Sequence, residues 1–147
     1  MQKTAVSVLC IATLCGCGVP MGPIAGGKLD GEIKPWPESW AFTDNIENIL
    51  LETRPDDPYS VTLWCVQDEN ALYIGSNDSS SNWIRFIDAD SDVVLSVEGH
   101  IYPARAERVE DPVLVDALQQ AFTSKYEIED PTNFFQSDGV LFALSPR

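Results

Sequence analysis

A group of aromatic, hydroxyl and cationic residues between positions 59 and 85 has the composition of a small-molecule site: Tyr59, Thr62, Trp64, Tyr73, Trp83 and Arg85. Within it, Tyr59–Val66 is rich in β-branched and aromatic residues and is predicted to be a strand. Alternation places Ser60, Thr62 and Trp64 on one face of that strand. Aromatic surface beside hydroxyls and a nearby arginine suits a planar ligand with polar edges. The same residue types also suit a small barrel core with its Trp and Tyr polar atoms satisfied at the rim, and taken alone they favour that interpretation.

Other kinds of site chemistry find little support in the sequence. His100 is the only histidine, which excludes a zinc site built from several histidines and argues against a Ser-His-Asp triad. The acidic run Asp88–Asp92 begins like a calcium loop, but Val93 and Gly99 stand where an EF-hand needs glycine and glutamate. No metal site is therefore expected. Cys65 lies in an apolar run with no neighbouring histidine, which predicts a buried structural thiol.

Composition and charge exclude two classes of partner. The chain has 147 residues, 44% of them hydrophobic and 22% charged, which fits one globular domain after a leader is removed. Its formal net charge is −14, and it has no cluster of lysine or arginine. Nucleic-acid binding and polybasic contact with anionic lipids both need such a cluster, so neither is expected.

The N-terminus has the pattern of a bacterial lipoprotein signal peptide. Met1–Lys3 supplies a short positive region, and Thr4–Leu14 is apolar but shorter than a transmembrane span. Leu14–Cys17 (LCGC) then resembles a lipobox, after which the leader is cleaved and the cysteine acylated. We therefore expect a signal peptide over 1–16 and a lipidated Cys17 that anchors the chain to a membrane of the bacterial cell envelope. The alternative is a buried apolar strand with incidental cysteines.

The residues after Cys17 suggest how the domain is attached. Segment 17–37 is rich in glycine and proline, which is typical of a tether, and 38–147 is expected to form the domain. Gly18 is not the acidic residue of an inner-membrane retention signal, which favours the outer membrane and a periplasmic domain.

Hydrophobic periodicity predicts six strands and two helices in the order β-β-β-α-β-β-α-β. Asp111 followed by Pro112 predicts the start of the second helix, because it pairs an N-cap with a first-turn proline. Antiparallel hairpins with few helices favour a mainly β (α+β) fold, in which a small antiparallel barrel carries two flanking helices. The predicted strands are 49–54, 59–66, 71–75, 93–97, 101–109 and 140–144, and the first helix is 82–89.

The segment from Gly26 to Val109 resembles the FMN-binding split β-barrel superfamily. The resemblance rests on element order and on short motifs such as YSVTLWCV, ALYIGS and NWIRFIDAD. That superfamily includes pyridoxamine 5′-phosphate oxidase-like and deazaflavin-dependent nitroreductase-like proteins. The resemblance implies a six-stranded split barrel, commonly a homodimer, with FMN or a deazaflavin bound between subunits and hydride transfer on that cofactor.

The resemblance also implies a set of cofactor-binding residues. They lie at the ends of the central hairpin and at the start of the following helix: Arg54, Ser60, Thr62, Ser76, Asn77, Ser81, Trp83 and Arg85. Family members usually have a lysine or arginine in the loop before the helix, but here the loop 77–82 (NDSSSN) has neither. Only Arg54 and Arg85 could compensate the negative charge of a cofactor phosphate. Two hypotheses remain open: an oxidoreductase that uses a flavin or deazaflavin, and a non-catalytic lipid-anchored binding protein that keeps the barrel without the cofactor.

Overall fold

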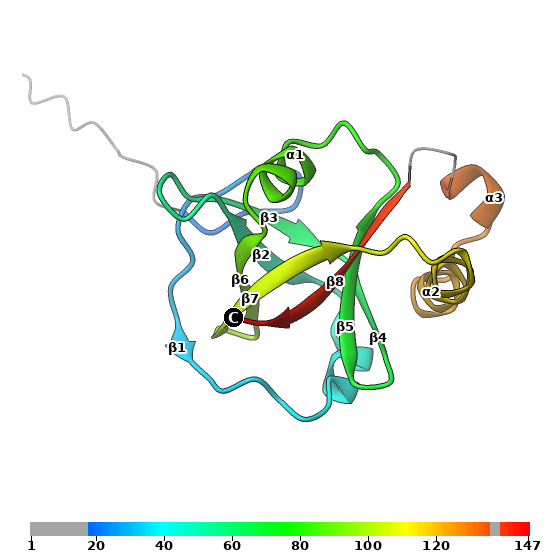
Figure 1. The fold of residues 1–147 in the computed structure, drawn as a ribbon, viewed down its shortest axis with the longest axis horizontal. Helices are drawn as coiled ribbons and strands as arrows, with labels where there is room; N and C mark the ends of the chain where they lie inside the picture. Colours follow the sequence, from blue (N-terminus) through cyan, green and yellow to red (C-terminus); the bar gives the residue numbers. More distant parts are fainter. Residues whose placement is uncertain (1–17, 136–138) are drawn as a thin grey trace, which may run out of the picture.

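The computed structural model describes residues 18–135 and 139–147. The expected signal peptide and Cys17 lie outside these residues. Eight strands form one curled sheet, with hydrogen-bonded neighbours in the order β3-β2-β6-β7-β8-β5-β4 and β1 added in parallel to β7 (Figure 1). The strands are β1 (Glu32–Ile33), β2 (Ile49–Thr53), β3 (Tyr59–Leu63), β4 (Cys65–Asp68), β5 (Ala71–Ser76), β6 (Asp92–Val97), β7 (His100–Arg108) and β8 (Val140–Pro146).

The two ends of the curled sheet are joined by a break in one predicted strand. The predicted strand 59–66 is interrupted at Trp64, so that β3 pairs with β2 while β4 pairs with β5. These two strands stand at opposite ends of the sheet order, yet a single residue joins them. The predicted fold class, a mainly β split barrel with flanking helices, is confirmed. The structure adds β1 and divides the second of the six predicted strands in two.

The interior of the barrel is filled by alternate side chains of these strands. Leu63 and Cys65 belong to the interior cluster, and Tyr59 and Val61 pack against it. Ser60, Thr62 and Trp64 point to the outer face, as the alternation predicts. Cys65 is fully buried and unpaired, which confirms the structural thiol. Burial raises the pKa of this thiol above its usual value.

The two predicted helices are present, and two short helical segments accompany them. Helix α1 (Asn82–Ala89) covers one side of the barrel, and α2 (Pro112–Lys125) lies beyond β4 and β5 (Figure 1). The Asp111 side chain accepts a hydrogen bond from the Val113 N–H at 2.9 Å, which confirms the predicted N-cap. The short segments are the 3₁₀ helix η1 (Ala41–Asn45) and α3 (Pro131–Phe134). Among the described residues, no helix is long and apolar enough to cross a bilayer.

A second hydrophobic cluster forms outside the barrel, between the sheet and α2. Leu118 and Phe122 of α2 are buried there against Val66, Tyr73 and Leu141 of the sheet. Trp64 packs against the same cluster rather than the barrel interior. The outer face of β4, β5 and β8 is therefore covered, and Trp64 belongs to this outer packing.

Much of the segment expected to be a tether contacts the barrel. Gly26 exchanges two backbone hydrogen bonds with Ser60 of β3, at 2.8 and 2.9 Å. Leu29 is buried, and its N–H donates to the buried carboxylate of Glu52 at 2.5 Å. The outer edge of β3 has backbone N–H and C=O groups that no other strand of the described sheet pairs with. Glycine lacks a side chain, so the N-terminal segment can approach this edge closely at Gly26.

Candidate functional site

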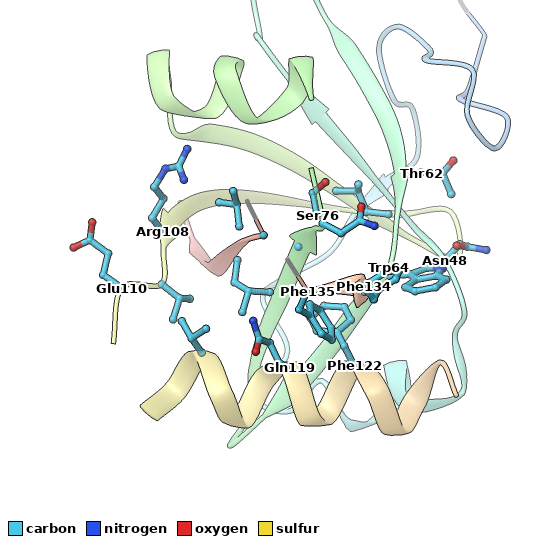
Figure 2. Close-up of a pocket in the computed structure, with 18 of the residues that line it drawn as sticks. Asn48, Thr62, Trp64, Ser76, Arg108, Glu110, Gln119, Phe122, Phe134 and Phe135 are labelled. Atoms are coloured by element: carbon cyan, nitrogen blue, oxygen red, sulfur yellow. The ribbon is translucent and has the colours of Figure 1, made fainter. Parts of the chain in front are cut away.

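A cavity of about 660 Å³ lies on the outer face of the barrel, beside the break at Trp64 (Figure 2). This volume falls within the usual range for small-molecule pockets. Its walls come from the ends of β3, β5 and β7, the start of β8, helices α2 and α3, and the N-terminal loop at Gly22 and Pro23. The side chains most relevant to ligand contact are Asn48, Thr62, Trp64, Ser76, Asn77, Arg108, Glu110, Val115, Gln119, Phe122, Phe134 and Phe135.

Stacked aromatic rings form the apolar wall of the cavity. The rings of Trp64 and Tyr126 lie parallel, with centroids 4.2 Å apart and planes 6° apart. Phe134 stacks on the same indole at 5.8 Å and 16°, while Phe122 lies 6.0 Å from Tyr126. Figure 2 shows Trp64, Phe122, Phe134 and Phe135 gathered on one side of the space. Such a wall presents flat, rigid apolar surface to a planar ligand.

The position of Trp64 depends on hydrogen bonds to the strand break from Lys125, the last residue of α2, and from Tyr126 directly after it. The hydroxyl of Tyr126 accepts the Cys65 N–H at 2.9 Å and lies 2.8 Å from the Glu47 carbonyl oxygen. Lys125 donates from Nζ to the carbonyl oxygens of Cys65 at 2.7 Å and Thr43 at 2.8 Å. Burial raises the pKa of the Tyr126 phenol well above its usual value, so this hydroxyl stays protonated. The break is therefore a hydrogen-bonded structure that fixes the indole.

The polar groups of the cavity are mostly uncharged. Asn48, Asn77 and Gln119 contribute amides, which can donate to or accept from a ligand. Among the described lining residues Arg108 is the only cation, and it makes two hydrogen bonds to Asp88, at 2.9 and 2.7 Å. The site thus offers stacking and neutral hydrogen bonding, with its arginine already paired.

Three of the predicted cofactor-binding residues lie together at the cavity: Thr62, Ser76 and Asn77. They come from the end of β3 and from the end of β5, which the curled sheet brings to one side. The remaining five are placed elsewhere in the fold.

Two of those five, Ser60 and Trp83, are buried. Ser60 is fully covered by Gly26, and its hydroxyl has no hydrogen-bond partner in the part of the chain that the structure describes. Trp83 lies in the barrel interior against Phe142, with ring centroids 5.6 Å apart. Both positions therefore contribute to packing in this structure.

The other three lie near α1. Arg54 forms a salt bridge with Asp57 at 3.1 Å and lies 4.1 Å from the ring centre of Phe86. Arg85 donates to the Asn82 side chain at 3.0 Å. Ser81 is the N-cap residue of α1, although its side chain makes no capping hydrogen bond.

A flavin phosphate does not fit the loop between β5 and α1. The Asp78 carboxylate accepts hydrogen bonds from the Ser80 N–H at 2.8 Å and the Ser80 hydroxyl at 2.6 Å. These bonds lower the pKa of Asp78, which keeps it charged at neutral pH. The Ser76 hydroxyl is itself bonded to the backbone of Asp78. A phosphate would therefore meet a negative charge and donors that are already satisfied.

Sequence reasoning identified Trp64 as part of an aromatic face but missed its stacking partners. In the sequence, Phe122 and Tyr126 are four residues apart, a spacing that puts both on one face of a helix. That spacing indicates a packed face without indicating which strand it meets. Phe134 and Phe135 follow Pro131 in a segment that carries no strong periodic pattern, so no signal marked them as site residues.

Comparisons with solved structures identify the class of fold. The heme storage protein HutZ from Vibrio cholerae is similar with a TM-score of 0.61 and 18% identity, over 73% of this chain and 86% of that one. A candidate pyridoxamine 5′-phosphate oxidase from Listeria innocua has a TM-score of 0.55 and 14% identity, over 73% and 89%. A FAD-binding protein from Mesorhizobium loti has a TM-score of 0.52 and 18% identity, over 72% and 82%.

The chain thus has the split-barrel fold of pyridoxamine 5′-phosphate oxidase-like proteins. No protein-family model and no curated protein sequence matches it. At these identities the likeness establishes the fold alone, and the ligand has to be argued from the cavity.

Proposed function

We propose that this protein is a lipid-anchored protein of the bacterial envelope whose cavity binds a planar, largely apolar ligand without a strongly anionic group. The observation that carries the proposal is the aromatic cavity of about 660 Å³ whose arginine, Arg108, is paired with Asp88. Contact with the aromatic wall formed by Trp64, Phe134 and Phe135 and hydrogen bonds to neutral amides would hold such a ligand. The net charge of −14 disfavours an anionic one.

The lipid anchor is proposed from the LCGC pattern at Leu14–Cys17. Acyl chains on Cys17 would hold the domain at a membrane permanently, since each buried methylene adds about 0.8 kcal/mol. The expected result is that the full chain is recovered in the membrane fraction and carries acyl chains by mass spectrometry. A full chain in which mass spectrometry finds Cys17 without acyl groups would contradict the anchor.

The cavity is tested with N-phenyl-1-naphthylamine, a neutral aromatic probe whose fluorescence rises in apolar surroundings. Residues 18–147 are suitable for the titration, because both hydrophobic clusters lie wholly between Trp36 and Leu144. We expect saturable binding of the probe, and we expect Val115→Asp to weaken it at least tenfold. Val115 lines the cavity, so a bound probe would remove water from the new carboxylate, at a cost of about 1–3 kcal/mol or more.

Val113→Asp is the matched control. Val113 belongs to the same first turn of α2 but is 77% exposed and does not line the cavity. Equal binding by the original chain and both variants would show that the probe binds elsewhere and would overturn the cavity as the ligand site.

A flavin remains the second candidate, because the fold is shared with a FAD-binding protein. FMN and riboflavin carry the same ring system, and only FMN has the phosphate. The proposal expects FMN to bind no more tightly than riboflavin, measured by quenching of flavin fluorescence. Binding of FMN that is much tighter would favour the flavin candidate and a phosphate site that the loop 77–82 does not provide.

A further inference from the structure

The first ten described residues carry no charge. Residues 18–27 read GVPMGPIAGG, and charged residues begin only with Lys28 and Asp30. In a chain with 32 charged side chains this stretch is notable for its position, since it directly follows Cys17. A segment without charge can approach a bilayer with little desolvation cost.

This stretch forms a closed loop that is attached to the barrel. Met21 and Ile24 exchange two backbone hydrogen bonds of 3.0 Å, which form the tip of the loop. At its base, the Gly27 N–H donates to the Gly18 carbonyl oxygen at 3.1 Å, and Gly26 pairs with Ser60 of β3. The loop therefore has a set orientation relative to the barrel.

The side chains of the loop divide into two groups. Val19, Met21 and Ile24 are 61%, 72% and 68% exposed, so large apolar side chains face outward. Gly22 and Pro23, between them in sequence, line one end of the cavity. Figure 2 shows this loop beside Thr62, at the edge of the cavity region. The exposed apolar group and the cavity wall thus belong to the same short loop.

We propose that residues 18–24 form a membrane-contact loop, which places the Gly22–Pro23 end of the cavity at the bilayer surface. The inference rests on the proposed lipid anchor at Cys17. Its consequence is that the ligand of the cavity is one that partitions into lipid and enters from the membrane.

The position of the anchor indicates that a lipid bilayer contacts the exposed apolar side chains of the loop. Consecutive Cα atoms are about 3.8 Å apart, so the acyl chains on Cys17 begin next to Gly18 and within a few residues of Met21. The three exposed apolar side chains then lie within reach of the same bilayer that holds the acyl chains. The acidic remainder of the domain is unsuited to insertion and stays in water.

A depth measurement on the full, processed chain tests the loop. A single cysteine is introduced as Met21→Cys and labelled with the environment-sensitive dye NBD, then the protein is reconstituted in phosphatidylcholine vesicles. Cys65 is buried and does not compete for the label. We expect emission at shorter wavelength than in detergent-free buffer and strong quenching by lipids that carry a nitroxide near the head group.

The matched control is Val113→Cys, because Val113 is equally apolar and is 77% exposed on α2. Its label should stay water-like and be quenched much less. Equal quenching at both positions on an acylated chain would overturn the membrane-contact loop and leave the anchor intact. A chain that mass spectrometry finds without acyl groups would overturn both the anchor and the membrane-contact loop. The titration with N-phenyl-1-naphthylamine tests the cavity independently of the anchor, because it uses residues 18–147.

Discussion

Tyr126 holds Trp64 by two different contacts: its ring stacks on the indole at 4.2 Å, and its hydroxyl accepts the N–H of the next residue, Cys65, at 2.9 Å. The stack orients the side chain that forms the cavity wall. The hydrogen bond satisfies a backbone donor that the strand break leaves out of the β ladder. Tyr126, directly after the end of α2, thus supports both the strand break and the site.

Tyr126→Phe separates these two roles, because it keeps the ring and removes the hydroxyl. We expect the free energy of unfolding to fall by about 1–3 kcal/mol, since the buried Cys65 N–H would lose its partner. Urea denaturation measures the change. Tyr59→Phe is the control, because the Tyr59 hydroxyl bonds to no residue within 18–135 or 139–147. A loss no larger than that of the control would mean that the hydroxyl does not support the break.

Arg108→Gln tests the ion pair at the cavity rim. Hydrogen bonds from Arg108 hold the pKa of Asp88 below its ordinary value of 3.8. A carboxyl group with a lowered pKa stabilises the fold above its unfolded pKa, and this contribution is lost as the pH falls through the folded value. The Arg108 and Asp88 side chains are 40% and 46% exposed, so solvent limits the effect at pH 7 to about 1 kcal/mol or less.

The measurement for this pair is the free energy of unfolding as a function of pH. The original chain should lose stability more steeply below about pH 4 than Arg108→Gln does. Arg85→Gln is the control, since Arg85 bonds to the neutral side chain of Asn82. If the free energy of unfolding falls equally with pH below about pH 4 in the original chain and in Arg108→Gln, the pair contributes nothing to stability.

Gly26→Ala should release the N-terminal loop. A Cβ atom at this position would lie 2.4 Å from the Gly18 carbonyl oxygen and 2.5 Å from the Pro20 nitrogen, so the backbone must move. We expect a loss of about 1–3 kcal/mol and faster thermolysin cleavage beside Met21 and Ile24. Gly18→Ala is the control, because a Cβ there meets nothing within 4 Å. Unchanged cleavage in Gly26→Ala would contradict the closed loop.

Cys65 should react with thiol reagents only when the protein opens. Its side chain is fully buried, and burial raises the pKa of the thiol, so little thiolate forms at neutral pH. Reaction with a disulfide reagent should be slow in buffer and rapid in denaturant. The labelling variant Met21→Cys provides an exposed thiol for comparison. Equally fast reaction of both thiols in the folded protein would contradict this burial.

Local sequence pattern was sufficient to predict most elements of the fold. Alternation between Tyr59 and Cys65 assigned each residue to the correct face, because side-chain direction along a strand follows from backbone geometry. The pair Asp111–Pro112 located the start of α2, because capping depends on neighbouring residues only. The side chains of segment 59–65 that face the barrel interior could therefore be predicted from the sequence, whereas Trp83, expected at a cofactor, lies in that interior.

The site depended on contacts between distant residues, which no local pattern contains. The break at Trp64 is held by Tyr126, 61 positions further along from Cys65, and the loop at Gly22 and Pro23 reaches the cavity by pairing at Gly26. The amino-acid sequence by itself indicated most of the strands and the two faces of segment 59–65, and it predicts the lipid anchor. Only the tertiary structure decided which aromatic rings meet and which arginines are already paired, because those outcomes depend on how the sheet curls.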